Sequence, residues 1–193
     1  MARIRYGEQI KDKATKALVE ALTTVGWQVA MEAYREKTYT NRTFNLHDSY
    51  GSAVFVNGVI VPDSKKYVNR SRSNRRNTHG HADSDNRYAK TGGLSGRQAL
   101  DDFFRTVEVS KKNKITLVVA AAMWYGEIVE SKGYVVFDEQ TVKREVAQRL
   151  LFVLPPILDK YPELKGFTPT LLRYIGVDEE YYNTQYLFKQ QGR

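Results

Sequence analysis

The residues best suited to chemistry are two glutamates in the stretch "MWYGEIVE", residues 123–130. Glu127 and Glu130 are three positions apart, so on a helix their carboxylates lie side by side and can share a proton or bind a metal ion. A metal or hydrolytic site needs further ligands, or a second carboxylate across the reacting bond. No His or Asp stands at such a spacing nearby. We therefore interpret both glutamates as surface, capping or subunit-contact residues.

Two other motifs invite a chemical interpretation and lack the residues to complete it. His79 and His81 in "HGH" offer two imidazoles, but no third metal ligand is evident beside them. The glycine-rich "TGGLSG" at 91–96 precedes an expected helix, yet it lacks the Gly-Lys-Ser/Thr of a phosphate-binding loop. The chain has no cysteine, which excludes disulfides and thiolate metal sites. We predict no enzyme, no catalytic residue, no metal site and no cofactor.

The charge of the chain points to an anionic partner. The 193 residues carry a formal net charge of +8, which favours nucleic acid or an acidic protein surface over a small acidic substrate. No apolar stretch approaches the roughly 18 residues of a membrane span, and the N-terminus lacks the apolar region of a signal peptide. We expect a protein that contacts no membrane and is made in a cytoplasm.

The first element that must position these residues is a long helix from Glu8 to about Lys37. Its apolar residues recur every three or four positions and form one stripe: Ile10, Ala14, Leu18, Leu22, Val25, Val29 and Ala33. At about 1.5 Å per residue the helix is roughly 45 Å long, more than one small sheet covers. We expect part of it to meet another chain.

A hairpin and a basic segment follow the helix. Two β-rich runs, 53–56 and 59–61, flank Asn57-Gly58, the dipeptide best suited to positive φ at both turn positions. Residues 62–91 are polar and carry eight basic against three acidic residues, so we predict an insertion loop there. The following six residues are its candidates for contact with DNA or an acidic partner: Lys65, Lys66, Arg70, Arg72, Arg75 and Arg76.

The second half of the chain predicts shorter elements. Ser95 is a candidate cap for a helix that carries Leu100 and Phe103, and strands 105–109 and 114–121 are expected to form a second hairpin. A short helix at 124–131, a short strand at 134–137 and a helix that begins after Asp138 and ends before Pro155 complete the pattern.

This order of elements predicts an α+β fold. We expect a long N-terminal helix and further helices packed on a small, mostly antiparallel sheet, with residues 1–155 as one domain. Residues 156–193 are expected to form an aromatic-rich C-terminal extension.

Two stretches resemble a known family. "NRTFNLHDSYGSAVFVNG" (41–58) is similar to the Asn-Leu-x-Asp-Ser stretch and hairpin of the HK97 gp10-like proteins, which are neck and tail-completion components of tailed bacteriophages. "LVVAAAMWYGEIVESKGYVVF" (117–137) resembles the second signature of that family, an apolar strand, a Tyr-Ala pair, a Val-Glu and a glycine turn, with Tyr125-Gly126 and Val129-Glu130 in the matching places. Phe44 and Gly126 stand where the family has glycine and alanine. The resemblance covers roughly residues 8–153.

The resemblance implies a structural role in the virion. Members of this family form rings at the portal vertex or the tail end, so we expect a homo-oligomeric ring that contacts other neck, portal or tail proteins. We expect it to be assembled in the host cytoplasm, with DNA as a further candidate partner. The alternative is a free nucleic-acid-binding protein that uses the basic patch at 65–76. The candidate subunit-interface residues are Trp27, Tyr34, Trp124, Tyr125, Glu127, Glu130, Tyr174, Tyr181, Tyr182, Tyr186 and Phe188.

Overall fold

The structure is a computed structural model that describes residues 2–38, 45–68, 96–109, 111, 114–122, 132–133, 136 and 139–167. The chain divides into two compact units. One unit comprises Met1–Val25 and Glu139–Arg193, and the other comprises Gly26–Asp138. The predicted boundary after residue 155 falls inside a helix, α5.

Helix α1 (Ala2–Glu36) confirms the predicted long helix and begins earlier than the apolar stripe indicated. Its 35 residues contribute to both units, since the division falls between Val25 and Gly26. Leu18, Leu22 and Val29 of the predicted stripe are buried, as is Val25 itself. The periodicity of apolar residues therefore located the buried face of this helix correctly.

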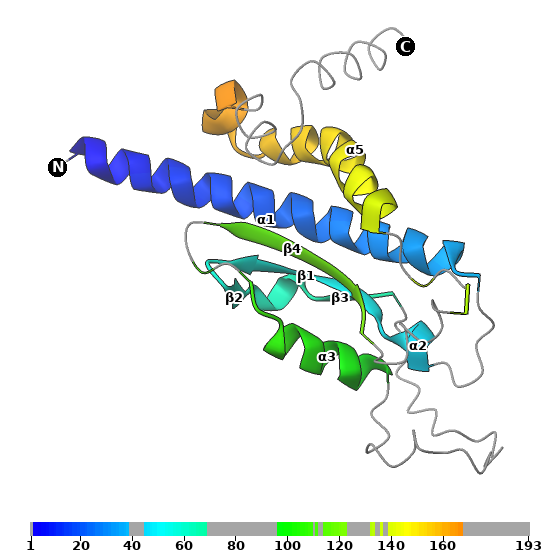
Figure 1. Cartoon of the computed structure of the whole chain (residues 1–193). Coiled ribbons are helices and arrows are strands. Elements are labelled where there is room, and N and C mark those ends of the chain that lie inside the picture. Colours follow the sequence, from blue (N-terminus) through cyan, green and yellow to red (C-terminus); the bar gives the residue numbers. More distant parts are fainter. Residues whose placement is uncertain are drawn as a thin grey trace, which may run out of the picture. The chain divides into compact units, whose positions relative to one another are not determined.

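The Gly26–Asp138 unit holds a four-stranded antiparallel sheet centred on β1 (Figure 1). The central strand β1 (Tyr50–Val56) pairs along its full length with β4 (Ile115–Ala121). Its other edge is shared by β2 (Val59–Ile60) and β3 (Lys66–Tyr67). This arrangement confirms the α+β fold with a small antiparallel sheet.

The β1–β2 hairpin turns at the predicted dipeptide. Asn57 has a φ of 54° and Gly58 a φ of 81°, so both turn residues are in the left-handed region. Positive φ at both positions matches the right-handed twist of the two strands, and Asn-Gly tolerates it better than other dipeptides. Local sequence alone therefore determines this turn.

Both faces of β1 are covered by helix. Ala53 and Phe55 pack in one apolar cluster with Leu100 and Phe104 of helix α3 (Gly96–Thr106), which lies on one side of the sheet (Figure 1). On the other side, a Cβ built on Gly26 of α1 would lie 2.9 Å from the Oγ of Ser52, so the last turns of α1 approach the sheet closely. Burial on both faces explains why β1 shows no alternation of apolar and polar residues.

Helix α3 contains Leu100 and Phe103, as predicted. Leu100 and Phe104 are its large buried side chains, and Phe103 is half-buried and packs against the same cluster. Leu100 and Phe104 are four positions apart and so lie on the same face of the helix. Ser95, the predicted cap of this helix, lies outside the described residues.

The predicted second hairpin is wrong. Arg105 and Thr106 are the last residues of α3, and residues 107–109 form no strand. Val107 and Val109 still pack against the apolar cluster around Phe104, which accounts for their alternation in the sequence. Strand β4 pairs instead with β1, its partner from the first half of the chain.

The prediction of a loop over the whole of 62–91 is also wrong at its start. Pro62–Ser64 form a 3₁₀ helix, η1, and Lys66–Tyr67 form β3. Residues 69–91 lie outside the described residues, as do the short helix predicted at 124–131 and most of the strand predicted at 134–137. Val136 of that strand is in a bend, and it is buried where its carbonyl accepts a 2.7 Å hydrogen bond from the Tyr50 hydroxyl.

Other short elements complete the described chain. Asn45–Asp48 form one helical turn, α2, directly before β1. In the other unit, helix α5 (Glu139–Leu158) is followed by a 3₁₀ helix, η3 (Pro162–Phe167). Ion pairs join Lys13 to Glu163 and Glu20 to Lys160, so the first part of α1 is held to the residues that follow α5.

Helix α5 continues past the prolines at which it was predicted to end. Pro155 and Pro156 are inside the helix, although neither has an N–H to donate to the preceding turn. Leu154, Ile157 and Leu158 around them are all buried. Burial of these side chains outweighs the loss of two helical hydrogen bonds, which sequence periodicity alone does not show. None of the helices is both long and apolar enough, within the described ranges, to cross a membrane.

Candidate functional site

The structure describes two of the six residues predicted for the basic patch. Lys65 precedes β3 and Lys66 lies in it, and both side chains are half-buried. The remaining four, Arg70, Arg72, Arg75 and Arg76, lie outside the described residues. The patch as a whole therefore stays a prediction, and its first residue has a specific environment.

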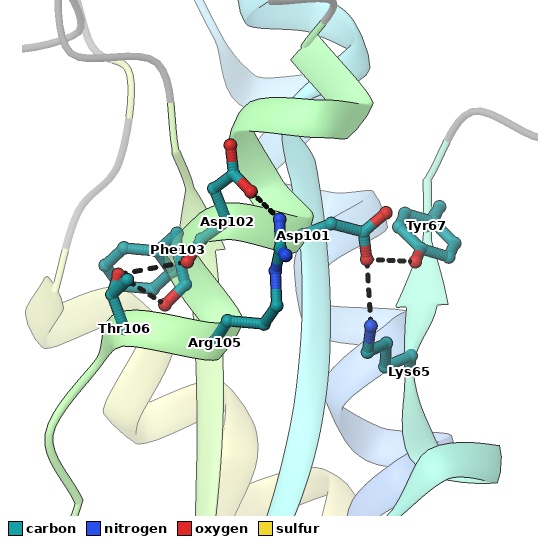
Figure 2. A network of polar contacts seen from close by, with 7 residues as sticks. All are labelled: Lys65, Tyr67, Asp101, Asp102, Phe103, Arg105 and Thr106. Carbon is teal, nitrogen blue, oxygen red and sulfur yellow. Dashed lines mark hydrogen bonds and ion pairs between the residues drawn. The ribbon is translucent and has the colours of Figure 1, made fainter.

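Lys65 belongs to a polar network between β3 and α3 (Figure 2). Its Nζ lies 2.9 Å from Oδ1 of Asp101, and the hydroxyl of Tyr67 donates a 2.6 Å hydrogen bond to the same oxygen. Arg97, one turn before Asp101 on α3, places its guanidinium carbon 4.1 Å from the centre of the Tyr67 ring. The Asp101 carboxylate thus accepts hydrogen bonds from two side chains at the edge of the sheet. The cation–π contact between Arg97 and Tyr67 lies beside it.

The network keeps Asp101 ionised and Tyr67 neutral. Burial alone would raise the pKa of the Asp101 carboxyl, but hydrogen bonds from Tyr67 and Lys65, together with the charges of Lys65 and Arg97, lower that pKa below its ordinary value. The pKa of Tyr67 is raised, first by burial and then by its hydrogen bond to the carboxylate. A phenol that donates to a carboxylate resists deprotonation, because losing its proton would place two negative charges together.

The neighbouring carboxylate, Asp102, makes a different kind of contact. It pairs with Arg105 of the same helix, and the side chains of both are exposed (Figure 2). The Thr106 hydroxyl donates to main-chain carbonyls of α3, those of Asp102 and Phe103. Asp102 therefore stabilises α3 alone, whereas Asp101 joins α3 to the sheet.

The side chain of Ser64 hydrogen-bonds to β1 at a position between its pairing with β2 and its pairing with β3. The Val54 N–H donates a 2.8 Å hydrogen bond to the Oγ of Ser64, and that hydroxyl lies 2.7 Å from the carbonyl of Val61. The Val61 N–H in turn donates to the Val54 carbonyl. The side chain of Ser64 thus satisfies a strand position that neither short strand reaches.

Two predicted subunit-interface residues are described, Trp27 and Tyr34, both on α1. Trp27 is 36% exposed, one of three large apolar side chains with substantial exposure among those that the structure describes. Tyr34 packs edge-to-face on Tyr50 with 5.7 Å between ring centres, and Lys37 lies over its ring at 4.1 Å. The pKa of the Tyr34 hydroxyl is raised, first by burial and then by the charge of Asp48.

The other predicted interface residues are outside the described chain. They are Trp124, Tyr125, Glu127, Glu130, Tyr174, Tyr181, Tyr182, Tyr186 and Phe188. Their assignment to a subunit contact stays a prediction.

Sequence reasoning missed the residues that define the network: Tyr67, Arg97 and Asp101. Lys65 and Asp101 are 36 positions apart. A contact between an edge strand and a helix at that separation has no fixed spacing in the sequence by which it could be predicted. The only local signal is the placement of Arg97 and Asp101 at i and i+4, which puts both on one face of α3.

The network has the chemistry of a structural contact. The described residues include no group of three or more His, Asp or Glu side chains able to hold a metal ion. Comparisons with protein-family models, with curated proteins and with solved structures found no match.

Proposed function

We propose that this chain is a structural protein of a tailed-bacteriophage virion, forming a ring in the neck or head–tail connector or completing the tail. One observation carries the proposal. The two stretches that resemble the HK97 gp10-like family, 41–58 and 117–137, contain strand β1 and residues 117–121 of β4, and these strands are each other's partner.

The pairing supports the resemblance because it joins two short motifs into one structural unit. It runs without interruption from Tyr50 opposite Ala121 to Val56 opposite Ile115. Two chance matches, far apart in the sequence, have no reason to fall on adjacent strands in register. The pair thus joins parts of both stretches, while Tyr125-Gly126 and Val129-Glu130 of the second stretch lie outside the described residues.

An exposed tryptophan on α1 supports self-association. The part of α1 before Gly26 is covered by the chain itself, since Leu18 and Leu22 are buried there, so the support comes from the part between Gly26 and Glu36. Trp27 in that part is 36% exposed, and exposed tryptophans are frequent anchors of protein–protein contacts. When such a contact joins two different patches on identical copies and the rotation closes, the product is a ring.

The proposed role is non-enzymatic. The partners would be further copies of this chain and other neck, portal or tail proteins, and the ring would assemble in the host cytoplasm before joining the virion. The net charge of +8 fits a surface that faces DNA or an acidic partner.

The experiment is the mass of the purified full-length protein by light scattering, at low and high salt, with and without a short DNA duplex. The proposal predicts a discrete oligomer that forms without DNA, and negative-stain electron microscopy should show closed rings. A monomer that changes mass only when DNA is added would contradict the proposal.

That second outcome would favour a free nucleic-acid-binding protein. Such a protein should bind DNA with a steep dependence on salt, which charge removal at Arg70, Arg72, Arg75 and Arg76 would flatten. Lys65 should contribute less than these arginines, because its ammonium group is already held by Asp101.

A further inference from the structure

Strand β3 has little main-chain attachment of its own. It is two residues long, pairs with Gly51 and Ser52 of β1, and is extended by one hydrogen bond from the Val68 N–H to the Tyr50 carbonyl, 3.1 Å long. So short an edge strand is expected to open more often than the seven-residue β1–β4 ladder on the other edge.

The side chains around β3 supply the attachment that its backbone lacks. Lys65 and Tyr67 alternate with Lys66, so both reach the same side and meet one oxygen of Asp101 (Figure 2). Arg97 covers the Tyr67 ring from the same helix. Each contact joins the edge of the sheet to α3.

Helix α3 is a firm anchor for these contacts. Leu100, directly before Asp101, is fully buried against Ala53 and Phe55 of β1, and Phe104 is 2% exposed in the same cluster. The helix turn that carries the Asp101 carboxylate is therefore fixed by the apolar packing of Leu100 and Phe104. Its lowered pKa means that it stays ionised at neutral pH.

We propose that Lys65, Tyr67, Arg97 and Asp101 form a clamp that holds β3 on the sheet, and that release of this clamp opens β3 as a local unit while the rest of the sheet stays folded. Lys65 and Tyr67 precede residues 69–95 in the chain, and Arg97 and Asp101 follow them. The clamp therefore also joins residues described just before 69–95 to residues described just after them.

Hydrogen exchange of single amides in the full-length protein tests the clamp. The Val68 amide reports on β3, while the amides of Asn57 and Ala122, bonded to Lys114 and Ser49, report on the β1–β4 pair. In Asp101→Asn we expect the Val68 amide to exchange at least about tenfold faster, because a charge-assisted contact is lost. Asn57 and Ala122 should stay within about twofold of the wild type.

Asp102→Asn is the matched control, since it removes the adjacent carboxylate without touching β3. It should leave all three amides at the wild-type rate. Tyr67→Phe keeps the ring under Arg97 and removes one donor, so it should accelerate Val68 by a smaller factor in a protein that folds normally. Unchanged exchange at Val68, or equal acceleration at Val68, Asn57 and Ala122, would overturn the clamp.

Discussion

Two buried serines differ in whether their hydroxyls are satisfied. Ser52 is fully buried on the face of the sheet next to Gly26, and its Oγ has no hydrogen-bond partner among the described residues. The Oγ of Ser64, equally buried, accepts from the Val54 N–H and lies within hydrogen-bonding distance of the Val54 and Val61 carbonyls. The same substitution at the two positions should therefore have opposite consequences for stability.

Ser64→Ala should lower the free energy of unfolding by about 1–3 kcal/mol, because it leaves the buried Val54 amide without an acceptor. Ser52→Ala should leave the free energy of unfolding unchanged or raise it, because it removes an unpaired buried hydroxyl. Urea denaturation of both variants measures the difference. A loss at Ser52 as large as that at Ser64 would show that the Ser52 hydroxyl has a partner in solution.

Two glycines lie where a methyl group would meet different kinds of atom. A Cβ on Gly51 would be 2.4 Å from the main-chain oxygen of Lys66 and 2.6 Å from a methyl carbon of Leu100. Because the backbone of β3 must move, we expect Gly51→Ala to lower the free energy of unfolding by about 1–3 kcal/mol.

Gly26→Ala provides the comparison. Its Cβ would meet the end of the Leu117 side chain at 2.6 Å, and the nearest other atoms belong to the Ser52 side chain. Side-chain shifts and the higher helix propensity of alanine should keep this variant within about 1 kcal/mol of the wild type in the same denaturation experiment. A Gly26→Ala loss larger than that of Gly51→Ala would contradict the assignment of the two contacts.

At the scale of the elements, sequence patterns predicted correctly the elements whose conformation is determined by neighbouring residues. The 3.6-residue periodicity predicted α1, and Asn57-Gly58 predicted the hairpin turn. The same patterns failed for elements whose conformation depends on tertiary contacts. Strand β3 is two residues in a polar segment, held by Asp101 and flanked by Ser64, so no periodicity marks it.

The same reason explains two further errors. Val107 and Val109 alternate like a strand because both contact the α3 cluster, yet they have no strand partner. The prolines in α5 have the local signature of a helix end and are overridden by the buried leucines around them. From the sequence, the candidate site could be predicted only as a group of basic residues. The contact of Lys65 could not be predicted, because its partner Asp101 lies on a helix far along the chain.

Helix α5 offers a test of how tertiary packing overrides a local preference. Pro156 is exposed within the helix, so its side chain contributes little packing, while its ring removes one main-chain donor. Pro156→Ala should raise the free energy of unfolding by about 1–2 kcal/mol, less than the full helix-propensity difference because the unfolded chain gains freedom. Thermal unfolding followed by circular dichroism measures the shift, and a lower melting temperature would contradict it.

The clamp between β3 and α3 should contribute to the fall in the free energy of unfolding at acid pH. Since the pKa of Asp101 in the folded chain lies below its ordinary value of 3.8, its stabilisation is complete above that pH and is lost as pH falls through the lowered pKa. Lys65 and Arg97 are the cations that face it, and the raised pKa of Tyr67 keeps that phenol neutral in this range. The titration of this network below pH 4 therefore belongs to Asp101.

Asp101→Asn should accordingly flatten the fall in unfolding free energy between about pH 4 and pH 2. Urea titrations of the wild type and the variant at several pH values measure the two slopes. Asp102→Asn is the control, because its partner Arg105 is on the same helix and both are exposed, and it should keep most of the wild-type slope. Equal slopes in the wild type and Asp101→Asn would rule out the clamp as a source of acid sensitivity.

At the scale of the whole molecule, the distribution of charge bears on the partner. The chain carries a net charge of +8, and the described part already uses several cations internally, in pairs that include Lys13 with Glu163 and Lys65 with Asp101. Such pairs steer no partner, because their fields largely cancel at a distance. An anionic partner would therefore be recognised mainly by cations other than these, and the predicted arginines of the basic segment are among the candidates.

The proposed ring makes α1 the element whose exposed residues matter most for assembly. Truncation of a tryptophan at the centre of a contact commonly costs about 2 kcal/mol or more of binding free energy. Trp27→Ala should thus shift the protein concentration at which the oligomer forms upward by at least about tenfold, as measured by light scattering over a dilution series. Val59→Ala is the control, since Val59 is 69% exposed at the hairpin and was not assigned to the contact. An unchanged assembly concentration for Trp27→Ala, or an equal shift in both variants, would remove α1 from the subunit contact.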